Sequence, residues 1–281
     1  MLAGDTEDMA YELLHSITAD LRLARQLADI ADEISMDYFK RRDLGVYVKE
    51  DRTHVTDGDR AVEEAIRAKL AQERPSDSVY GEEFGTEGSS RRQWIIDPID
   101  GTANFMRGVP IWATLISLVI DGRPEVGVVS APALNRRWWG ATGHGAYLDD
   151  DLADSDTATD RRIQVSGVGR LEEGQFSYGS MQYWLQVGKL APIVEFNERM
   201  WRSRAIGDFW PYMLVAEGSV EVACEIDLQP YDMAALVPII EEAGGTFTSI
   251  DGKEGPWHGS VLATNGILHD EALAIFRAHE K

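Results

Sequence analysis

The sequence predicts an α/β protein in which sheets and helices are stacked in layers. Residues 94–148 form a series of short apolar strands, whereas the segments from residue 176 to residue 278 alternate between strand and helix patterns. Two amphipathic helices precede both regions. Because each sheet and each helix must bury its apolar side against another element, this order favours layers that share one core.

The first helix is expected over residues 11–39, where apolar side chains recur at helical spacing, and Gly45 is expected to close its last turn. The acidic residues 1–10 are expected to form a disordered tail ahead of it. The second helix follows Thr56, whose hydroxyl can cap it, and stops before Pro75.

Five short strands are expected in the middle of the chain. Asp121-Gly122 separates two of them and is typical of a tight hairpin turn. Residues 149–160 contain six Asp and no aromatic residue, which indicates an exposed loop. The expected strands cover residues 94–96, 113–120, 125–130, 136–141 and 145–148.

The second half of the chain alternates. Strands are expected at residues 176–180, 204–207, 220–226, 246–250 and 260–264, and helices at residues 192–200, 209–217, 233–243 and 268–278. Glycines follow two of these helices, as is common at helix ends. Since no internal repeat or linker interrupts the chain, we expect one domain over residues 11–281 with two subdomains, at about 11–160 and 161–281.

The composition argues against some classes of function. The chain has 27 basic and 48 acidic residues, a net charge of −21, and no dense basic run, so binding of nucleic acid through a basic surface is not expected. The single cysteine, Cys224, lies in an apolar run and is expected in the core. No secretory signal and no membrane-length apolar segment occurs, which indicates a cytoplasmic protein without a membrane partner.

Two aspartates at the end of an apolar strand form the strongest candidate site. The strand 94–96 delivers Asp97, Pro98 is expected to stop further pairing, and Asp100 follows before a turn at Gly101. Carboxylate and carbonyl oxygens on such a corner suit a hard cation such as Mg²⁺. An isolated Asp-x-x-Asp-Gly segment is more often a turn that caps a helix.

Two further acidic segments accompany this corner. Glu82 and Glu83 follow Gly81, and paired glutamates are by themselves usually a solvated surface. Asp232 begins an expected helix, where an aspartate is most often an N-cap. Each acid taken singly favours a structural role, and only their order and flanking residues indicate a metal site.

The order of these segments resembles the inositol-monophosphatase family over roughly residues 20–280. The likeness is carried by Gly81-Glu82-Glu83, by Trp94-Ile95-Ile96-Asp97-Pro98-Ile99-Asp100-Gly101-Thr102 and by an aromatic-Asp-x-Ala-Ala segment at Asp232 that leads to Glu-Ala-Gly-Gly. The resemblance implies a sugar-phosphatase-type α-β-α-β-α sandwich, a homodimer, and Mg²⁺-dependent hydrolysis of a small phosphate ester with two or three ions per site, Mn²⁺ being an acceptable substitute.

The resemblance also implies roles for single residues. Glu83, Asp97 and the Ile99 carbonyl would bind one Mg²⁺, and Asp97, Asp100 and Asp232 would bind a second. Glu83 would also lie beside a weaker third ion. The metal ions would offset the charge of the phosphate, which an acidic chain cannot do by itself, and would make hydroxide available near neutral pH.

The same family pattern assigns the phosphate and the attacking water. Gly101 and Thr102 would receive the phosphate through backbone N–H groups, and Thr102 with Glu83 would position the water. Asp59 matches an acid that supports the metal-bound waters, although it can also be a first-turn helix acid. Lys49 lies in the preceding loop at a spacing that departs slightly from the family pattern.

The alcohol of the ester should be selected by the corner at residues 204–208 and by Glu225. Asp208 stands where the inositol enzymes usually have a small or hydroxyl residue, and an acid so close to a phosphate site calls for a cationic substrate. With Tyr231 in place of the usual Trp, the chain is similar to the histidinol-phosphatase branch. The expected substrate-binding residues are Asp100, Gly101, Thr102, Arg204, Gly207, Asp208, Glu225 and Asp232.

Other interpretations stay open at this stage. Asp208 could cap a helix, and Trp210 could pack in the core rather than near an imidazole. Trp138 and Trp139 suit a dimer interface or a core equally. The chain could be an inositol or sugar phosphatase of broad specificity, or a regulatory protein that retains the fold without catalysis.

Overall fold

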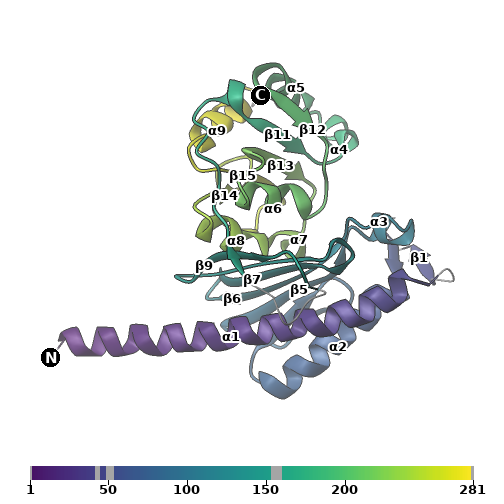
Figure 1. The fold of residues 1–281 in the computed structure, drawn as a ribbon, viewed down its shortest axis with the longest axis vertical. Coiled ribbons are helices and arrows are strands. Elements are labelled where there is room, and N and C mark those ends of the chain that lie inside the picture. Colours follow the sequence, from purple (N-terminus) through teal and green to yellow (C-terminus); the bar gives the residue numbers. More distant parts are fainter. Residues whose placement is uncertain (1, 42–44, 49–53, 153–159, 280–281) are drawn as a thin grey trace.

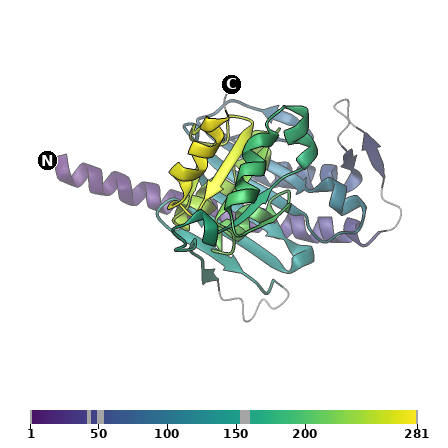
Figure 2. The ribbon, with the colours of Figure 1, turned by 90° about the horizontal axis from the view of Figure 1, so that it is seen from above.

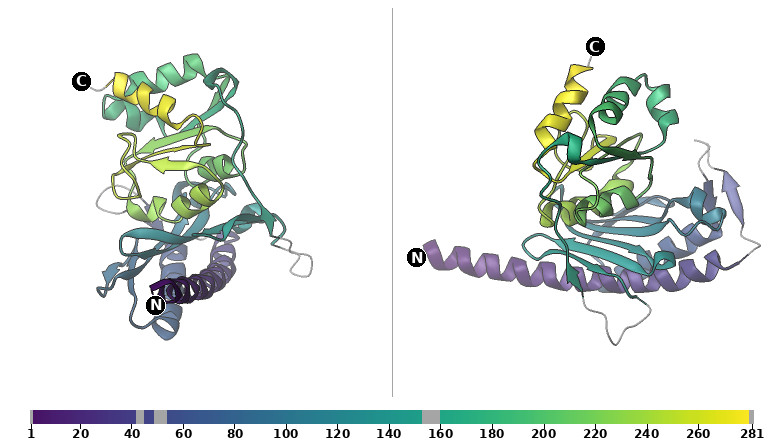
Figure 3. Two further views of the ribbon diagram at one scale, coloured as in Figure 1. Left: turned by 90° about the vertical axis from the view of Figure 1, so that its left-hand side faces the viewer. Right: turned by 45° about the horizontal axis from the view of Figure 1, so that its top comes forward.

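Five layers alternate through the molecule, in the order helices, sheet, helices, sheet, helices (Figure 1). The computed structural model describes residues 2–41, 45–48, 54–152 and 160–279; for residues 2–16 and 48 it describes only the course of the backbone. The predicted α-β-α-β-α sandwich is therefore confirmed. The two large sheets face each other across one helical layer in both views of Figure 3.

The first layer consists of α1 (Leu2–Phe39) and α2 (Asp57–Glu73), which cover one face of the larger sheet. Helix α1 includes residues 2–10, which corrects the expected tail, and its first turns extend past the sheet (Figure 2). Leu, Ala, Met and Glu in this segment favour helix, so the helical hydrogen bonds continue beyond the packed part. Thr56 caps α2 as expected, in a capping box with Asp59.

The larger sheet has eight strands in the order β10-β9-β8-β7-β6-β5-β3-β4, and all neighbours are antiparallel except β3 and β5. The strands are β3 (Ser78–Gly81), β4 (Gly85–Glu87), β5 (Arg92–Asp100), β6 (Ala113–Ile120), β7 (Arg123–Ala131), β8 (Arg136–Ala141), β9 (Gly145–Asp149) and β10 (Arg161–Arg162). Asp121 and Gly122 join β6 to β7 with positive φ angles, as the hairpin prediction required. Within the predicted loop 149–160, residues 153–159 lie outside the described part.

Strand β5 does not end at Pro98, which corrects the expectation from the sequence. Asp97 pairs with Leu115 and Asp100 with Ala113, so β5 carries one more residue than β6 between these pairs. This bulge accommodates a proline because Pro98 needs no N–H partner there. The Pro98 carbonyl accepts a hydrogen bond from the Thr114 hydroxyl (2.8 Å). The bulge sets Asp97 and Asp100 on either side of Ile99.

The smaller sheet has five strands in the order β12-β11-β13-β15-β14. These are β11 (Gln175–Tyr178), β12 (Arg202–Arg204), β13 (Val222–Ile226), β14 (Thr246–Thr248) and β15 (Ser260–Thr264). A separate hairpin pairs β1 (Val46–Val48) with β2 (His54–Thr56) and lies at the far end of α1 (Figure 2). The sequence did not predict β1–β4 or β10, which are short or only partly apolar.

Two sets of helices flank the smaller sheet (Figure 1). Between the sheets lie α6 (Trp210–Ala216), α7 (Pro230–Met233) and α8 (Leu236–Glu242), and on the outer face lie α4 (Met181–Gln186), α5 (Leu190–Arg199) and α9 (His269–Ala278). The short helix α3 (Thr102–Met106) follows β5, and 3₁₀ turns occur at Pro132–Leu134 and Leu171–Glu173. The helix predicted over residues 233–243 is found as α8, which begins at Leu236, whereas Met233 is the last residue of the separate short helix α7.

Three large apolar clusters fill the space between the layers. The central cluster includes Trp138 and Phe209 and joins both sheets through α6 and α8. Trp138 is fully buried and Trp139 is buried, so both belong to the core. Cys224 is buried in the outer cluster, as predicted. The central cluster contains residues from both predicted subdomains. The boundary between them near residue 160 therefore stays a prediction.

A search of the described helices finds none that is long and apolar enough to cross a membrane.

Candidate metal and substrate site

The bulge at the end of β5 forms the centre of the site. Asp97 is 2% exposed, and one of its carboxylate oxygens accepts a hydrogen bond from the Ile99 N–H (3.0 Å). Gly101 then turns the chain into α3 with φ 87°, a left-handed conformation that favours glycine. Rigid backbone thus fixes both aspartates and the intervening Ile99 carbonyl.

Asp232 completes a first group of acids. It is the third residue of α7 and accepts a hydrogen bond from the backbone N–H of Gln229, the N-cap residue (2.6 Å), so it closes a capping box and is not itself the N-cap. Its carboxylate also meets those of Asp97 and Asp100, with one oxygen from each within 4.8 Å of the others. The capping interpretation and the metal interpretation are therefore compatible, because a carboxylate has two oxygens.

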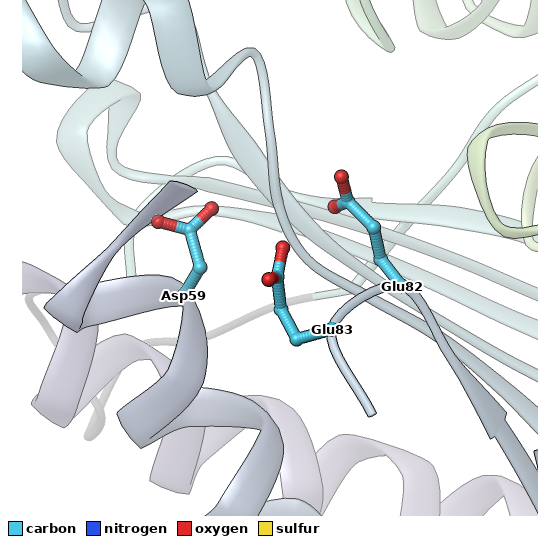
Figure 4. Close-up of side chains that lie close together, drawn as sticks. All are labelled: Asp59, Glu82 and Glu83. Carbon is cyan, nitrogen blue, oxygen red and sulfur yellow. The ribbon is translucent and has the colours of Figure 1, made fainter. Parts of the chain in front are cut away.

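A second group consists of Asp59, Glu82 and Glu83, whose carboxylates converge in Figure 4. Asp59 comes from the start of α2, and the two glutamates follow β3. The Thr102 hydroxyl lies 3.2 Å from Asp59 Oδ1 and 3.0 Å from the Ile99 carbonyl oxygen. Thr102 therefore connects the second group to the β5 bulge.

The structure distinguishes the two glutamates, which the sequence does not. Burial, and next the charge of Glu82, raise the pKa of Asp97 well above its usual value, and Glu82 also raises the pKa of Asp232. The Glu83 N–H donates to the buried Glu63 carboxylate (2.7 Å). Glu82 thus lies near both groups, whereas sequence reasoning selected Glu83. No signal in the sequence separates the two glutamates, because β3, which Glu82 directly follows, was not predicted.

The electrostatics of the site favour cations. Burial raises the pKa of Asp232 to about 7 and that of Asp59 to about 6. Burial and the charges of neighbouring acids also raise the pKa of Asp100 well above its usual value. Clustered buried carboxylates repel one another, and bound divalent ions would relieve this repulsion. The donors are all oxygens, as Mg²⁺ requires.

Asp208 lies directly against residues 97–101, the bulge and turn that we call the metal corner. It has φ 58°, and its Oδ2 accepts a hydrogen bond from Asn104 Nδ2 (2.9 Å). A Cβ at Gly101 would be 3.3 Å from the Asp208 Cγ. The side chain of Asp208 does not cap α6, whose N-cap is Phe209 without a side-chain cap bond. The capping alternative is therefore not what the structure shows.

Glu225 extends the group of acids beyond Asp208, away from the metal corner. It lies on β13 and accepts a hydrogen bond from the Tyr212 hydroxyl (3.1 Å). Burial, and next the charge of Asp208, raise its pKa to about 8. The charge of Asp208 is also the largest neighbour effect on Asp100. Asp100, Asp208 and Glu225 thus form one continuous acidic surface from the metal corner to β13.

Three other residues lie apart from this surface or outside the described part. Trp210 is half-buried and packs against the central apolar cluster, which agrees with the core alternative. Arg204 is exposed, and its guanidinium donates to the Ser203 carbonyl (2.7 Å). Lys49 lies outside the described residues.

Comparison with known proteins gives a consistent family. The model of the inositol monophosphatase family matches residues 18–281. The chain is 51% identical to the histidinol-phosphatase of Streptomyces coelicolor, over 90% of this chain and 95% of that protein. It is 50% identical to the histidinol-phosphatase of Mycobacterium tuberculosis, over 92% and 98%. The extragenic suppressor protein suhB of Bartonella henselae has a similar fold, with a TM-score of 0.83, 26% identity, and coverage of 93% and 100%.

Proposed function

The chain belongs to the inositol monophosphatase family, and we propose that it is a Mg²⁺-dependent histidinol-phosphatase, which converts L-histidinol phosphate and water to L-histidinol and phosphate in histidine biosynthesis. One observation carries the choice of substrate: two partly buried acids, Asp208 and Glu225, adjoin the metal corner. The ammonium and imidazolium groups of histidinol phosphate would neutralise them. High identity to two histidinol-phosphatases supports the same choice.

Members of this family are metal-dependent, and the two acidic groups fit that requirement. Asp97, Asp100, Asp232 and the Ile99 carbonyl would hold Mg²⁺, with Glu82 and Glu83 beside them. We propose that Glu82 is the more important metal ligand of the two glutamates, because its charge raises the pKa of both Asp97 and Asp232. Bound ions supply positive charge for the phosphoryl oxygens and lower the pKa of a bound water.

The remaining residues orient the substrate and the water. Thr102 is held between Asp59 and the Ile99 carbonyl, so its oxygen has a fixed direction toward the site. We propose that Thr102 positions the attacking water and that Asp59 accepts the proton through the threonine hydroxyl. The N–H groups of Gly101 and Thr102 would contact the phosphate. Hydrolysis then depends on position and electrostatics, without a covalent enzyme intermediate.

Steady-state kinetics with a set of phosphate esters tests this proposal. We expect kcat/KM for histidinol phosphate to exceed that for inositol 1-phosphate and glycerol 2-phosphate by about a hundredfold, equivalent to about 2.7 kcal/mol, and activity to disappear in EDTA. Similar kcat/KM values for all three esters would indicate the broad phosphatase instead. Absence of Mg²⁺-dependent phosphate release with every ester would leave the regulatory alternative.

The assembly and location of the protein also stay proposals. We propose a homodimer that works in the cytoplasm, as the family resemblance and the biosynthetic reaction imply. Sedimentation equilibrium at micromolar concentration would test the dimer, since a monomer and a dimer of a 31.3 kDa chain are readily distinguished.

A further inference from the structure

We propose that Tyr212 and Asn104 are positioning residues that hold Glu225 and Asp208 in place for a cationic alcohol. This inference rests on the proposed function, because it concerns the selectivity of the same site. Neither residue is part of the metal corner or a carrier of charge. Each donates one hydrogen bond to one of the two acids.

Tyr212 fixes the orientation of Glu225. The tyrosine is 2% exposed and belongs to the central apolar cluster, so its ring has little freedom to move. Its hydroxyl lies 3.1 Å from Glu225 Oε2. The other oxygen of Glu225 lies over Gly179, where a Cβ would be only 2.1 Å from Oε1. Any larger residue at 179 would displace the carboxylate, so the glycine and the tyrosine together select its position.

Asn104 fixes the orientation of Asp208. Its Nδ2 donates both to Asp208 Oδ2 and to the Ile111 carbonyl, each at 2.9 Å. The amide thereby links α3, the segment before β6 and the corner at Asp208. Gly101 leaves the space into which Asp208 fits. Asp208 is therefore held by a residue of α3, the helix that directly follows the metal corner.

Each acid has one oxygen engaged by a neutral donor, and no side chain among the described residues donates to Asp208 Oδ1 or Glu225 Oε1. A mostly buried carboxylate that lacks part of its hydrogen bonds is costly, so these oxygens are suited to a ligand that brings N–H donors and positive charge. Neutral donors hold the acids without cancelling their charge. Selectivity for a cation therefore depends on Tyr212 and Asn104 as well as on the acids.

The test measures the ratio of kcat/KM for histidinol phosphate to that for glycerol 2-phosphate, in the full-length protein with Mg²⁺. We expect Tyr212→Phe and Asn104→Ala each to lower this ratio about tenfold, chiefly through a higher KM for histidinol phosphate. Tyr147→Phe removes a hydroxyl from a ring stacked on Trp139 and serves as the matched control, with an unchanged ratio.

Three results would overturn the proposal in different ways. An equal loss with both substrates would mean that Tyr212 and Asn104 merely support the fold. A wild-type preference that persists unchanged in both variants would remove the positioning role and leave the proposed function intact. A wild-type protein without preference for histidinol phosphate would refute both. If Tyr212→Phe does not fold, as judged by thermal unfolding, the Asn104→Ala variant decides.

Discussion

The two halves of the site are built in different ways. The metal half comes mainly from four consecutive residues of one strand, Asp97 to Asp100, in the bulge of β5. The substrate half combines Asp208, at the corner before α6, with Glu225 on a strand of the other sheet. Because the metal half is local and the substrate half is assembled by packing, we expect hydrolysis and selectivity to respond to different mutations.

The largest effect is expected from Asp97→Asn. The change removes a charge that both proposed metal positions require, so kcat should fall at least about a thousandfold for every ester. Phosphate release at saturating Mg²⁺ measures this effect, and circular dichroism checks that the variant folds. Activity close to the wild-type level would refute the metal assignment.

A matched pair of variants, Glu82→Gln and Glu83→Gln, tests which glutamate contributes more to the metal half. Glu82 acts on both Asp97 and Asp232, so its loss should reduce kcat/KM about a hundredfold and raise the Mg²⁺ concentration needed for half-maximal activity. Glu83→Gln should reduce kcat/KM by less than about tenfold. The opposite order of effects would restore Glu83 as the main ligand, as the sequence alone suggested.

Asp208→Asn tests the substrate half. The variant keeps the size of the side chain and loses its charge, so kcat/KM for histidinol phosphate should fall about 10- to 100-fold. Glycerol 2-phosphate, which has an uncharged alcohol, should be hydrolysed at a rate within about threefold of wild type. An equal decrease for both esters would show that Asp208 supports the metal corner rather than selecting the alcohol.

The smallest effect concerns stability and pH. The folded pKa values of Asp232, about 7, and Asp59, about 6, lie above those of the unfolded chain. Raised carboxyl pKa values mean that the metal-free fold loses stability as pH rises from about 4 to about 7, because folding then opposes ionisation. Mg²⁺ binds the ionised acids, so it should counteract this loss.

We therefore expect Mg²⁺ to raise Tm by several degrees relative to EDTA, with a larger increase at about pH 8 than at about pH 5.5. Differential scanning fluorimetry measures this difference directly. Asp97→Asn serves as the control and should show little increase at either pH. An increase that does not vary with pH would contradict the involvement of acids with raised pKa values.

Some features could be predicted from the sequence because they depend only on residues that are neighbours in the chain. Thr56 caps α2 because its hydroxyl accepts N–H groups within three residues, and Asp121-Gly122 forms the hairpin because both residues tolerate positive φ. Such features depend on neighbours along the chain, so no knowledge of distant contacts was needed. The proposed metal half was predicted in another way, because the order of its acids in the chain resembles a family pattern.

Other features depended on contacts between distant segments. The sequence predicts that Pro98 ends a strand, but β5 continues through Pro98 with a bulge because it pairs with β6. The sequence left open whether Trp138 lies in an interface or in the core. In the structure it is fully buried in the cluster between the two sheets. The expected helix over residues 233–243 begins only at Leu236, as α8, after the separate short helix α7 that carries Asp232.

By itself, the sequence predicted that this protein carries an ordered set of acids for metal-assisted phosphate chemistry, because the order and the flanking residues of these acids match a family pattern. Only the tertiary structure gives a reason to propose Glu82 rather than Glu83 as the main ligand, since the charge of Glu82 acts on both Asp97 and Asp232 while the Glu83 N–H is bound to the Glu63 carboxylate. It also brought Asn104 to Asp208 and Tyr212 to Glu225, pairs whose members come from separate elements and meet only when the layers pack.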